Sequence, residues 1–261
     1  MNLDLTGKTA LVCGSTQGIG KASAMELANL GASVILLARN ESKLKDVVAE
    51  LATGKGQVHH YRVADFSDTN NVKEVANEIA SNYTIEILVN NTGGPAGGLI
   101  SDADESAFLA AFNQHLINNQ NIVKALLRGM KTAGYGRIIN IISTSVKVPL
   151  SGLGVSNTIR GAVASWAKTM ANELGQFGIT VNNVLPGATM TARLDAIAEN
   201  KAQKTGKSKE EVFKQMASET PAQRVGLPEE IGNAVAFLAS PAAAYINGIN
   251  LPVDGGRTGS L

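Results

Sequence analysis

Seven short apolar runs recur along the chain, separated by stretches in which apolar residues return every three or four positions. The runs span residues 9–13, 33–38, 58–63, 85–90, 137–142, 179–184 and 249–253. Such runs are typical of strands buried on both faces, and the stretches between them have the period of amphipathic helices. This alternation predicts a parallel sheet with helices on both faces, and right-handed crossovers make it a doubly wound, Rossmann-type α/β fold. We therefore expect a single domain over residues 1–261, with a seven-stranded parallel sheet inside a three-layer αβα arrangement.

A glycine-rich turn, residues 14–20, follows the first run, and a stretch of helical periodicity that ends at Gly31 follows the turn. The N-terminus of a helix offers free N–H groups and the positive end of the helix dipole to a phosphate group. Glycine lets the backbone turn tightly and lets a ligand approach it closely. A tight turn without a ligand is the alternative, but the strand before it and the helix after it favour a nucleotide site. The predicted binding residues of the turn are Gly14, Ser15, Gln17, Gly18, Ile19 and Gly20.

Composition and charge narrow the range of partners. Of the 261 residues, 44% are hydrophobic and 17% are charged, and the net charge is +1. A charge this small argues against electrostatic binding to nucleic acid or to a membrane. No apolar run approaches the roughly 18 residues of a membrane-spanning helix, and residues 1–5 lack the pattern of a signal peptide. The single cysteine, Cys13, cannot form an internal disulfide, so we expect a cytoplasmic protein.

The spacing of the glycines, G-x-x-x-G-x-G, resembles the turn motif of the short-chain dehydrogenase/reductase family, with the 3-oxoacyl-acyl-carrier-protein reductases as the most similar type. Cys13 stands where that family most often has threonine. Further similar elements lie at residues 90–93, 186–191 and 224–256, so the resemblance spans residues 5–256. It implies an oxidoreductase that binds a nicotinamide dinucleotide and acts on a small-molecule carbonyl or acyl substrate.

The second apolar run ends at Arg39, and no acidic residue stands at this strand end. In dinucleotide-binding folds an acid at this place binds the 2′-hydroxyl of NAD, whereas an arginine accommodates the 2′-phosphate of NADP. A guanidinium can contact a phosphate through two parallel hydrogen bonds. We therefore expect NADP(H) as the preferred cofactor and NAD(H) as the second choice. A solvated arginine at the start of the next helix is the alternative interpretation of Arg39.

The third run leads to Asp65, which the resemblance places beside the adenine ring of the cofactor. A turn or helix-capping residue is the alternative, and both roles are compatible. The same run contains His59 and His60, whose side chains face opposite sides of a strand and so do not form a shared metal site. No other cluster of metal ligands stands out in the sequence, and we expect no metal.

Two further elements are similar to parts of the family that contact the cofactor: one stabilises the central sheet and lines the cofactor cleft, and the other holds the nicotinamide carboxamide. Residues 90–93 follow the fourth run and are otherwise a plain Asn/Gly turn. Residues 186–191 follow the sixth run, and a strand-ending Pro-Gly turn would explain the first two but not Thr191. The residues that the resemblance assigns to cofactor binding here are Asn90, Asn91, Gly93, Pro186, Gly187 and Thr191.

The fifth run ends at Ser143, where the family has a serine that hydrogen-bonds the substrate carbonyl or hydroxyl. Thirteen residues later the family has a tyrosine and, four residues on, a lysine; this chain has Ser156 and Arg160 there. The spacing places both side chains on one helix face. An alkyl hydroxyl is a far poorer acid than a phenol and arginine stays protonated, so Ser156 does not replace the tyrosine. Arg160 can still bind the ribose hydroxyls of the cofactor or an anionic group of the substrate.

His115 aligns with an asparagine that completes the catalytic set of the family, although Asn113, Asn118 and Asn119 lie close to it in sequence. An imidazole titrates near neutrality, so His115 is a candidate proton donor, either directly or through a serine hydroxyl or water. A helix histidine that bonds a backbone carbonyl is the alternative.

A helical stretch over residues 192–220 resembles the substrate lid of the family, and its apolar residues favour a partly apolar substrate. A surface pair of helices is the alternative. Two helices are expected over residues 103–132, and the second packs against its copy in the family, so we expect a homodimer or homotetramer. The leading hypothesis is an NADP(H)-dependent oxidoreductase with atypical proton-transfer residues. The alternatives are a dinucleotide-binding sensor or scaffold with little or no turnover, and a lyase or isomerase.

Overall fold

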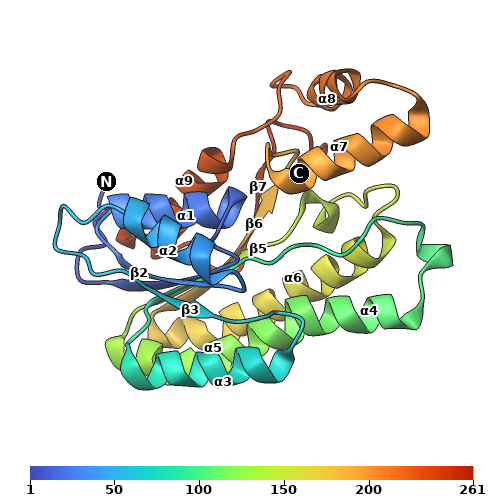
Figure 1. Cartoon of the computed structure of the whole chain (residues 1–261). Helices are drawn as coiled ribbons and strands as arrows, with labels where there is room; N and C mark the ends of the chain where they lie inside the picture. The colour runs from blue at the N-terminus through green and yellow to red at the C-terminus, as the bar shows by residue number, and fades with distance from the viewer. Residues whose placement is uncertain (261) are drawn as a thin grey trace.

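A single seven-stranded parallel sheet forms the centre of the computed structural model, which describes residues 1–260 (Figure 1). The strand order is β3-β2-β1-β4-β5-β6-β7. The strands are β1 (Thr9–Cys13), β2 (Ser33–Ala38), β3 (His60–Val63), β4 (Ile87–Asn90), β5 (Gly136–Ile141), β6 (Ile179–Pro186) and β7 (Asn250–Val253). Each predicted apolar run therefore overlaps one strand, and the doubly wound Rossmann-type fold is confirmed.

Helices cover both faces of this sheet, as Figure 1 shows. On one face, α1 (Gly18–Asn29), α2 (Glu41–Glu50) and α9 (Pro228–Ala239) share a core with the side chains of β1 and β2 that point to them. On the other face, α3 (Thr69–Asn82), α5 (Asn118–Ala133) and α6 (Gly154–Leu174) share a second core. In β1, Ala10 and Val12 belong to the first core and Leu11 and Cys13 to the second, which is the alternation that strand geometry requires.

The sheet reverses its winding between β1 and β4, which are neighbours. From β1 the chain winds outward through β2 to β3, then returns to β4 and winds the other way. Ligands of open α/β sheets bind outside the carboxyl ends of the strands at such a switch point. Here Asn91 joins the two strand ends, because its Nδ2 donates to the carbonyl oxygens of Cys13 at 3.2 Å and Gly14 at 3.1 Å.

The third strand begins at His60, two residues later than the apolar run predicted. Just before this strand, two side-chain atoms accept hydrogen bonds that backbone carbonyls accept elsewhere in the sheet. His59 Nδ1 accepts from the Val34 N–H at 3.1 Å, and Ser33 Oγ accepts from the Val58 N–H at 3.1 Å.

Within residues 1–260, no three His, Cys, Asp or Glu side chains are grouped so that they could hold a metal ion.

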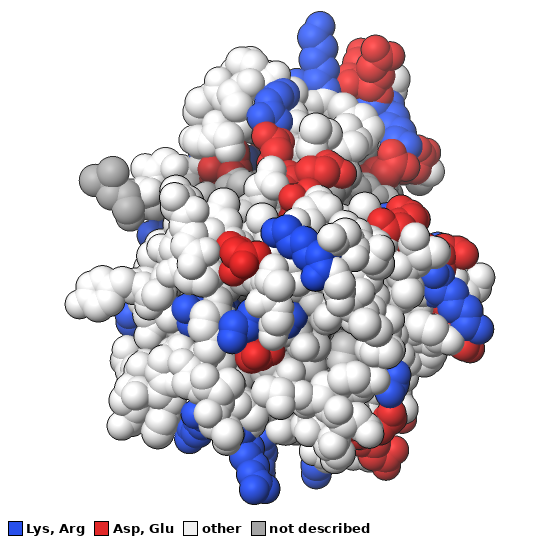
Figure 2. All heavy atoms as spheres, turned by 90° about the vertical axis from the view of Figure 1, so that its left-hand side faces the viewer, with Lys and Arg blue, Asp and Glu red and all other residues white. Residues whose placement is uncertain are grey.

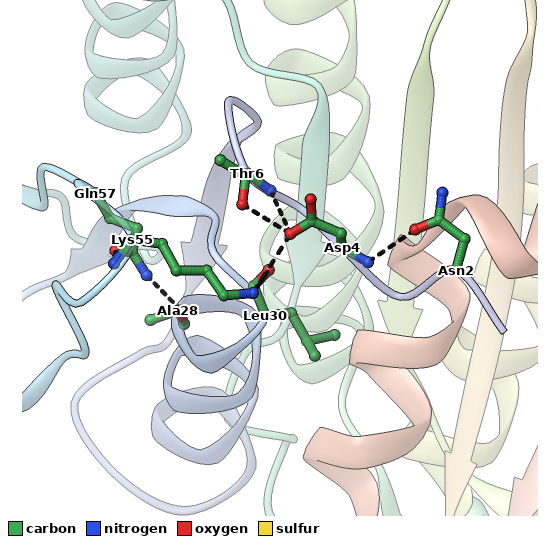
Figure 3. A network of polar contacts seen from close by, with 7 residues as sticks. All are labelled: Asn2, Asp4, Thr6, Ala28, Leu30, Lys55 and Gln57. Atoms are coloured by element: carbon green, nitrogen blue, oxygen red, sulfur yellow. Dashed lines mark hydrogen bonds and ion pairs between the residues drawn. The ribbon is translucent and has the colours of Figure 1, made fainter.

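The N-terminal segment is tied to the end of α1 and to the loop before β3 by the polar contacts drawn in Figure 3. Asp4 accepts from the Thr6 hydroxyl at 2.7 Å and from Lys55 Nζ at 3.4 Å, and Lys55 Nζ also donates to the Leu30 carbonyl at 3.3 Å. The buried Gln57 side chain donates to the Ala28 carbonyl at 2.7 Å. Exposed ion pairs contribute little free energy, so the buried Gln57 bond is the strongest of these ties.

Two further helices, α7 (Ala192–Thr205) and α8 (Lys209–Ser218), lie beyond the edge of the main layers, in orange in Figure 1. They pack on each other through a small apolar cluster of Ala198, Ala202 and Val212.

The face drawn in Figure 2 carries Lys, Arg, Asp and Glu side chains interspersed among uncharged atoms, in keeping with the small net charge. None of the helices in the described part of the chain is long and apolar enough to cross a membrane.

Candidate active site

The turn after β1 is shaped so that only glycine fits at three of its positions. Gly14 has φ +58°, and a Cβ there would lie 2.5 Å from the Asn91 carbonyl oxygen. Gly18 has φ +54°, and its Cβ would lie 3.1 Å from Cγ2 of Thr191. A Cβ on Gly20 would collide with the Gly14 carbonyl oxygen. The conformational freedom of glycine is therefore used here for close packing as well as for turning.

Unused hydrogen-bonding groups point to a ligand at this turn. Ser15 is fully buried, and its Oγ has no hydrogen-bond partner among the described residues. Gln17, the residue before α1, makes no side-chain cap, so no side chain there satisfies the N–H groups of the first helical turn. Buried polar groups normally have partners, and a helix N-terminus attracts anions. The turn fits the phosphates of a dinucleotide on these grounds.

Arg39 and Asp65 lie at the carboxyl ends of the paired strands β2 and β3, as predicted. Arg39 is exposed. Hydrogen bonds from Ser67, and secondarily the charge of Arg39, lower the pKa of Asp65. Asp65 makes a turn with Ser67, whereas the N-cap of α3 is Asp68; the capping role considered for Asp65 is therefore wrong.

Thr191 caps the helix α7, because its Oγ1 accepts from the Leu194 N–H at 3.3 Å. Its methyl group lies over Gly18, so the end of β6 meets the glycine turn. An open hollow at this meeting point is lined by Gly18, Met190, Thr191, Ala192, Asp195 and Pro228. The structure thus brings the turn together with the segment that follows Pro186 and Gly187.

Four asparagines form a hydrogen-bonded ladder across the sheet. Asn90 Nδ2 donates to Asn140 Oδ1 at 2.9 Å, Asn140 Nδ2 to Asn183 Oδ1 at 2.9 Å, and Asn183 Nδ2 to Asn250 Oδ1 at 2.8 Å. The register pairs these residues across β4, β5, β6 and β7. Sequence reasoning found only Asn90. The missed signal was an amide side chain inside each of the other apolar runs.

The predicted catalytic serines and arginine lie at the end of β5 and on α6. Ser143 follows β5, and its Oγ accepts from the Ser145 N–H at 3.1 Å. Ser156 and Arg160 are 7% and 8% exposed on α6. The Nη1 of Arg160 donates to the carbonyl of Ile141, the last residue of β5, at 3.1 Å. Burial, and secondarily the charge of Arg193, lower the pKa of Arg160 to about 10, so the guanidinium is charged at neutral pH.

His115 lies in a five-residue π-helix, η2 (Asn113–Ile117), between α4 (Glu105–Phe112) and α5. Its Nδ1 is 2.5 Å from the Thr92 hydroxyl, and its buried Nε2 has no partner among residues 1–260. Its partner is thus a side chain rather than the backbone carbonyl considered from the sequence. Burial, followed by the charges of Arg160 and Arg193, lowers the pKa of His115 to about 2. To donate a proton, His115 would need a protonated ring, and the lowered pKa disfavours that form.

Acidification tests the environment of His115. A histidine that stays neutral in the folded protein takes up a proton on unfolding at any pH below about 6.5, so its contribution to stability is lost as pH falls through that value. From pH 7 to pH 5 the wild-type protein should lose roughly 2 kcal/mol more than His115→Gln, which keeps an amide near Thr92 without titrating. Urea unfolding at both pH values measures the difference. Equal acid sensitivity would show that His115 is protonated in the fold.

Arg193, at the start of α7, was not predicted. Its Nη1 donates to the Gly94 carbonyl at 2.8 Å and its Nη2 to the Pro95 carbonyl at 2.9 Å. The start of α7 is thereby fixed to the loop that follows β4. The sequence signal was an arginine two residues after the predicted cofactor residue Thr191.

Comparison with known proteins agrees with this geometry. Residues 14–258 match the family model described as enoyl-(acyl carrier protein) reductase. The 3-oxoacyl-(acyl-carrier-protein) reductase FabG of Vibrio cholerae is 36% identical over 256 residues, 97% of this chain and 98% of that protein. The NADPH-dependent reductase BacG of Bacillus subtilis is 31% identical over 259 residues, 98% of this chain and 100% of that protein. The crystal structure of L-sorbose reductase from Gluconobacter frateurii, complexed with NADPH and L-sorbose, has a TM-score of 0.93 and 28% identity and covers 100% of both chains.

The turn and the sheet define a dinucleotide-binding α/β protein, and these matches place it among the oxidoreductases. The chain belongs to the short-chain dehydrogenase/reductase family. It spans nearly the full length of these relatives.

Proposed function

We propose that this protein is an NADP(H)-dependent reductase that interconverts a carbonyl and a secondary alcohol in a small molecule. The observation that carries the proposal is the cradle at the glycine turn, where Gly14, Gly18 and Gly20 leave no room for side chains and the buried Ser15 hydroxyl has no hydrogen-bond partner within residues 1–260. Arg39 at the end of β2 supports NADP(H) over NAD(H), because a guanidinium suits a 2′-phosphate. The NADPH-dependent relative BacG and the NADPH complex of L-sorbose reductase support the same cofactor.

The cofactor would be held along the carboxyl edge of the sheet. Residues 14–20 would bind its phosphates, Arg39 and Asp65 its adenosine half, and Asn90, Asn91 and Gly93 would line the cleft. Pro186, Gly187 and Thr191 would hold the nicotinamide end. When bound, NADPH supplies a hydride to the carbonyl carbon of a substrate.

The residues at the end of β5 would act on the carbonyl oxygen. The Ser143 hydroxyl can donate a hydrogen bond to this oxygen, since its own Oγ is engaged only as an acceptor from the Ser145 N–H. Arg160 would supply positive charge to the ribose or the substrate. Because the protonated form of His115 is disfavoured, water is the better source of the proton that completes the alcohol.

The helices α7 and α8 would form the lid over the substrate. Their mutual packing on a small cluster of their own, and the fixation of α7 to the loop after β4 by Arg193, support this role. Assembly as a homodimer or homotetramer through α5, and a cytoplasmic location, belong to the same proposal.

A second function is favoured by one observation. In the resemblance to the family, Ser156 and Arg160 stand where a tyrosine and a lysine transfer the proton. A dinucleotide-binding sensor or scaffold with little turnover would need neither. Lyase or isomerase chemistry at the same site is a third alternative.

Restoring the pair distinguishes these functions. The purified protein should oxidise NADPH, followed by absorbance, with at least one member of a panel of ketones, aldehydes and 3-oxoacyl thioesters. Ser156→Tyr with Arg160→Lys should then lower kcat/KM roughly tenfold, because the existing pair works as a set that the new one does not reproduce. Ser156→Ala is the matched control for loss of the hydroxyl alone. An inactive wild type with an active double variant would instead support the sensor or scaffold.

A further inference from the structure

Three nitrogen-bearing side chains converge on the loops beyond β4 and β5. Arg160 is anchored to the carbonyl of Ile141 at the end of β5. His115 is anchored to Thr92, two residues beyond the end of β4. Arg193 reaches from the lid to the carbonyls of Gly94 and Pro95 in the same loop. After burial, the charge of Arg193 contributes to the lowered pKa values of both Arg160 and His115, and the charge of Arg160 contributes to that of His115.

No acidic side chain within residues 1–260 forms an ion pair with Arg160 or Arg193, whose recorded partners are backbone carbonyls. Three other arginines form ion pairs: Arg62 with Glu78 at 2.7 Å, Arg224 with Glu230 at 2.6 Å and Arg257 with Glu219 at 2.8 Å. The buried Arg137 instead donates to the Gly136 and Gly178 carbonyls and lies over the ring of Tyr135, a ring contact for which Arg160 and Arg193 have no counterpart among the described contacts. The acid closest in sequence to Arg193 on the lid, Asp195, is engaged by Lys209 at 2.6 Å. The site therefore has an excess of positive charge.

Burial makes this excess unfavourable in the free protein. Arg160 is 8% exposed, and one neutral carbonyl is its recorded acceptor among the described residues. A buried charge is normally paired, since removal from water is not offset by a single neutral hydrogen bond. The lowered pKa of Arg160, caused by burial and then by the charge of Arg193, has the same origin. Because His115 is neutral it adds no positive charge, but the repulsion between Arg160 and Arg193 remains.

We propose that the substrate carries a compact anionic group, a carboxylate or a phosphate, which binds between Arg160 and Arg193 beside the carbonyl to be reduced. The inference rests on the proposed function, since it names the substrate class of the same site. A guanidinium offers a planar set of donors that matches both anions. With the anion bound, each arginine gains the charged partner that the chain itself does not provide.

Matched substrates test the inference through turnover. The panel consists of 3-oxo acids of increasing chain length, their methyl esters and 2-oxoalkyl phosphates, each assayed with NADPH. We expect kcat/KM for the acid or the phosphate to exceed that for the ester by about tenfold to a hundredfold, the range of a hydrogen bond to a charged group. Comparison of acids with phosphates identifies which anion fits. Esters that turn over as well as both anions would overturn the inference and leave the proposed reductase standing.

Variants of Arg193 separate its charge from its contact with the loop. Arg193→Gln should abolish most of the preference for the anion by raising its KM. Arg193→Lys should keep most of it, because lysine retains the charge but cannot donate to Gly94 and Pro95 in one fixed fork. Lys204→Gln removes the same charge at an exposed position near the far end of α7 and should leave the preference unchanged. If Lys and Gln at 193 act alike, Arg193 serves only as a latch and the inference is wrong.

Binding to the NADPH complex tests the anion site without turnover. The probes are 3-hydroxybutyrate, glycerol phosphate and the uncharged 3-hydroxybutanamide, titrated by calorimetry. We expect at least one anion to bind about tenfold more tightly than the amide, and Arg193→Gln to remove the difference. Anion binding without reduction of any carbonyl would keep this site and overturn the reductase. Arginine changes that weaken NADPH instead of the anion would assign the charges to the cofactor and overturn the site.

Discussion

Gly14→Ala is expected to destabilise the fold by about 3 kcal/mol and to weaken NADPH binding by roughly a thousandfold. Two physical effects combine at this position. Gly14 has φ +58°, where a side chain costs about 1–2 kcal/mol. The new Cβ would also lie 2.5 Å from the Asn91 carbonyl oxygen and 2.8 Å from Asn91 Nδ2, so the ends of β1 and β4 must move apart.

That movement would reach the phosphate site directly. Asn91 Nδ2 holds the carbonyls of both Cys13 and Gly14, and the buried Ser15 hydroxyl follows in the chain. A displaced turn loses the alignment of its N–H groups with the phosphates, and with it the charge-assisted hydrogen bonds that they make. Urea unfolding and NADPH fluorescence titration measure the two effects on the same protein.

Gly134→Ala is the matched control. Gly134 has φ +59°, nearly the same strain, but a Cβ there would meet no atom within 4 Å, and it lies at the end of α5. It should lose only about 1 kcal/mol and bind NADPH normally, since the strain is partly offset by the reduced entropy of the unfolded chain. If Gly14→Ala behaves like this control, close packing at the turn is not what shapes the cofactor site.

The fold could be predicted from the sequence because its signal is local. Runs such as residues 33–38 are apolar at nearly every position, and only a strand covered on both faces buries all of them. The third and fourth strands each begin two residues later than their runs. At the start of the third, the side chains of His59 and Ser33 accept the hydrogen bonds that backbone carbonyls would otherwise accept. The amino-acid composition of a run does not show that side chains will accept hydrogen bonds in place of backbone carbonyls.

The positions of the proposed cofactor residues could also be expected from the sequence, since each lies at or beyond a strand end and parallel strand ends meet at one edge of the sheet. The protonation state and the contacts of the residues around the proposed substrate site were harder to predict from the sequence. His115 titrates near neutrality as an isolated side chain, and its lowered pKa depends on burial and on arginines far away in sequence. Arg193 acquires its place only when the lid meets the loop after β4. Both the lowered pKa of His115 and the contacts of Arg193 depend on residues that are distant in sequence. The spacing of residues along the chain therefore does not predict them.

The asparagine ladder lies between these cases, because its members are visible in the sequence but their alignment is not. Each strand contributes one amide to the row, and in β6 a second asparagine, Asn182, stands next to the one that joins it. The register of β4, β5, β6 and β7 brings the four into one row. The row passes from Asn90, a predicted cofactor residue, to the C-terminal strand. It therefore links Asn90 by hydrogen bonds to the last strand of the sheet.

Asn140→Ala should destabilise the protein by about 4 kcal/mol, because Asn140 is fully buried in the middle of this row. The change removes a donor and an acceptor at once and leaves the Asn90 and Asn183 amides with an unpaired buried group each. Each such group costs about 1–3 kcal/mol, and the cavity adds to this. Urea unfolding measures the loss. Asn82→Ala, which removes one exposed hydrogen bond to the Glu78 carbonyl, should change stability by less than about 0.5 kcal/mol.

Asn140→Asp keeps the size of the side chain and separates hydrogen bonding from packing. A carboxylate can still accept from Asn90, but it can donate to Asn183 only when protonated. Burial raises the pKa of such a group, so the folded variant binds a proton that the unfolded chain releases above about pH 4. The stability of Asn140→Asp should therefore fall as pH rises from 5 to 8, relative to wild type. A variant as stable as wild type at pH 8 would show that the row tolerates a missing donor, and that packing rather than the amide ladder aligns these strands.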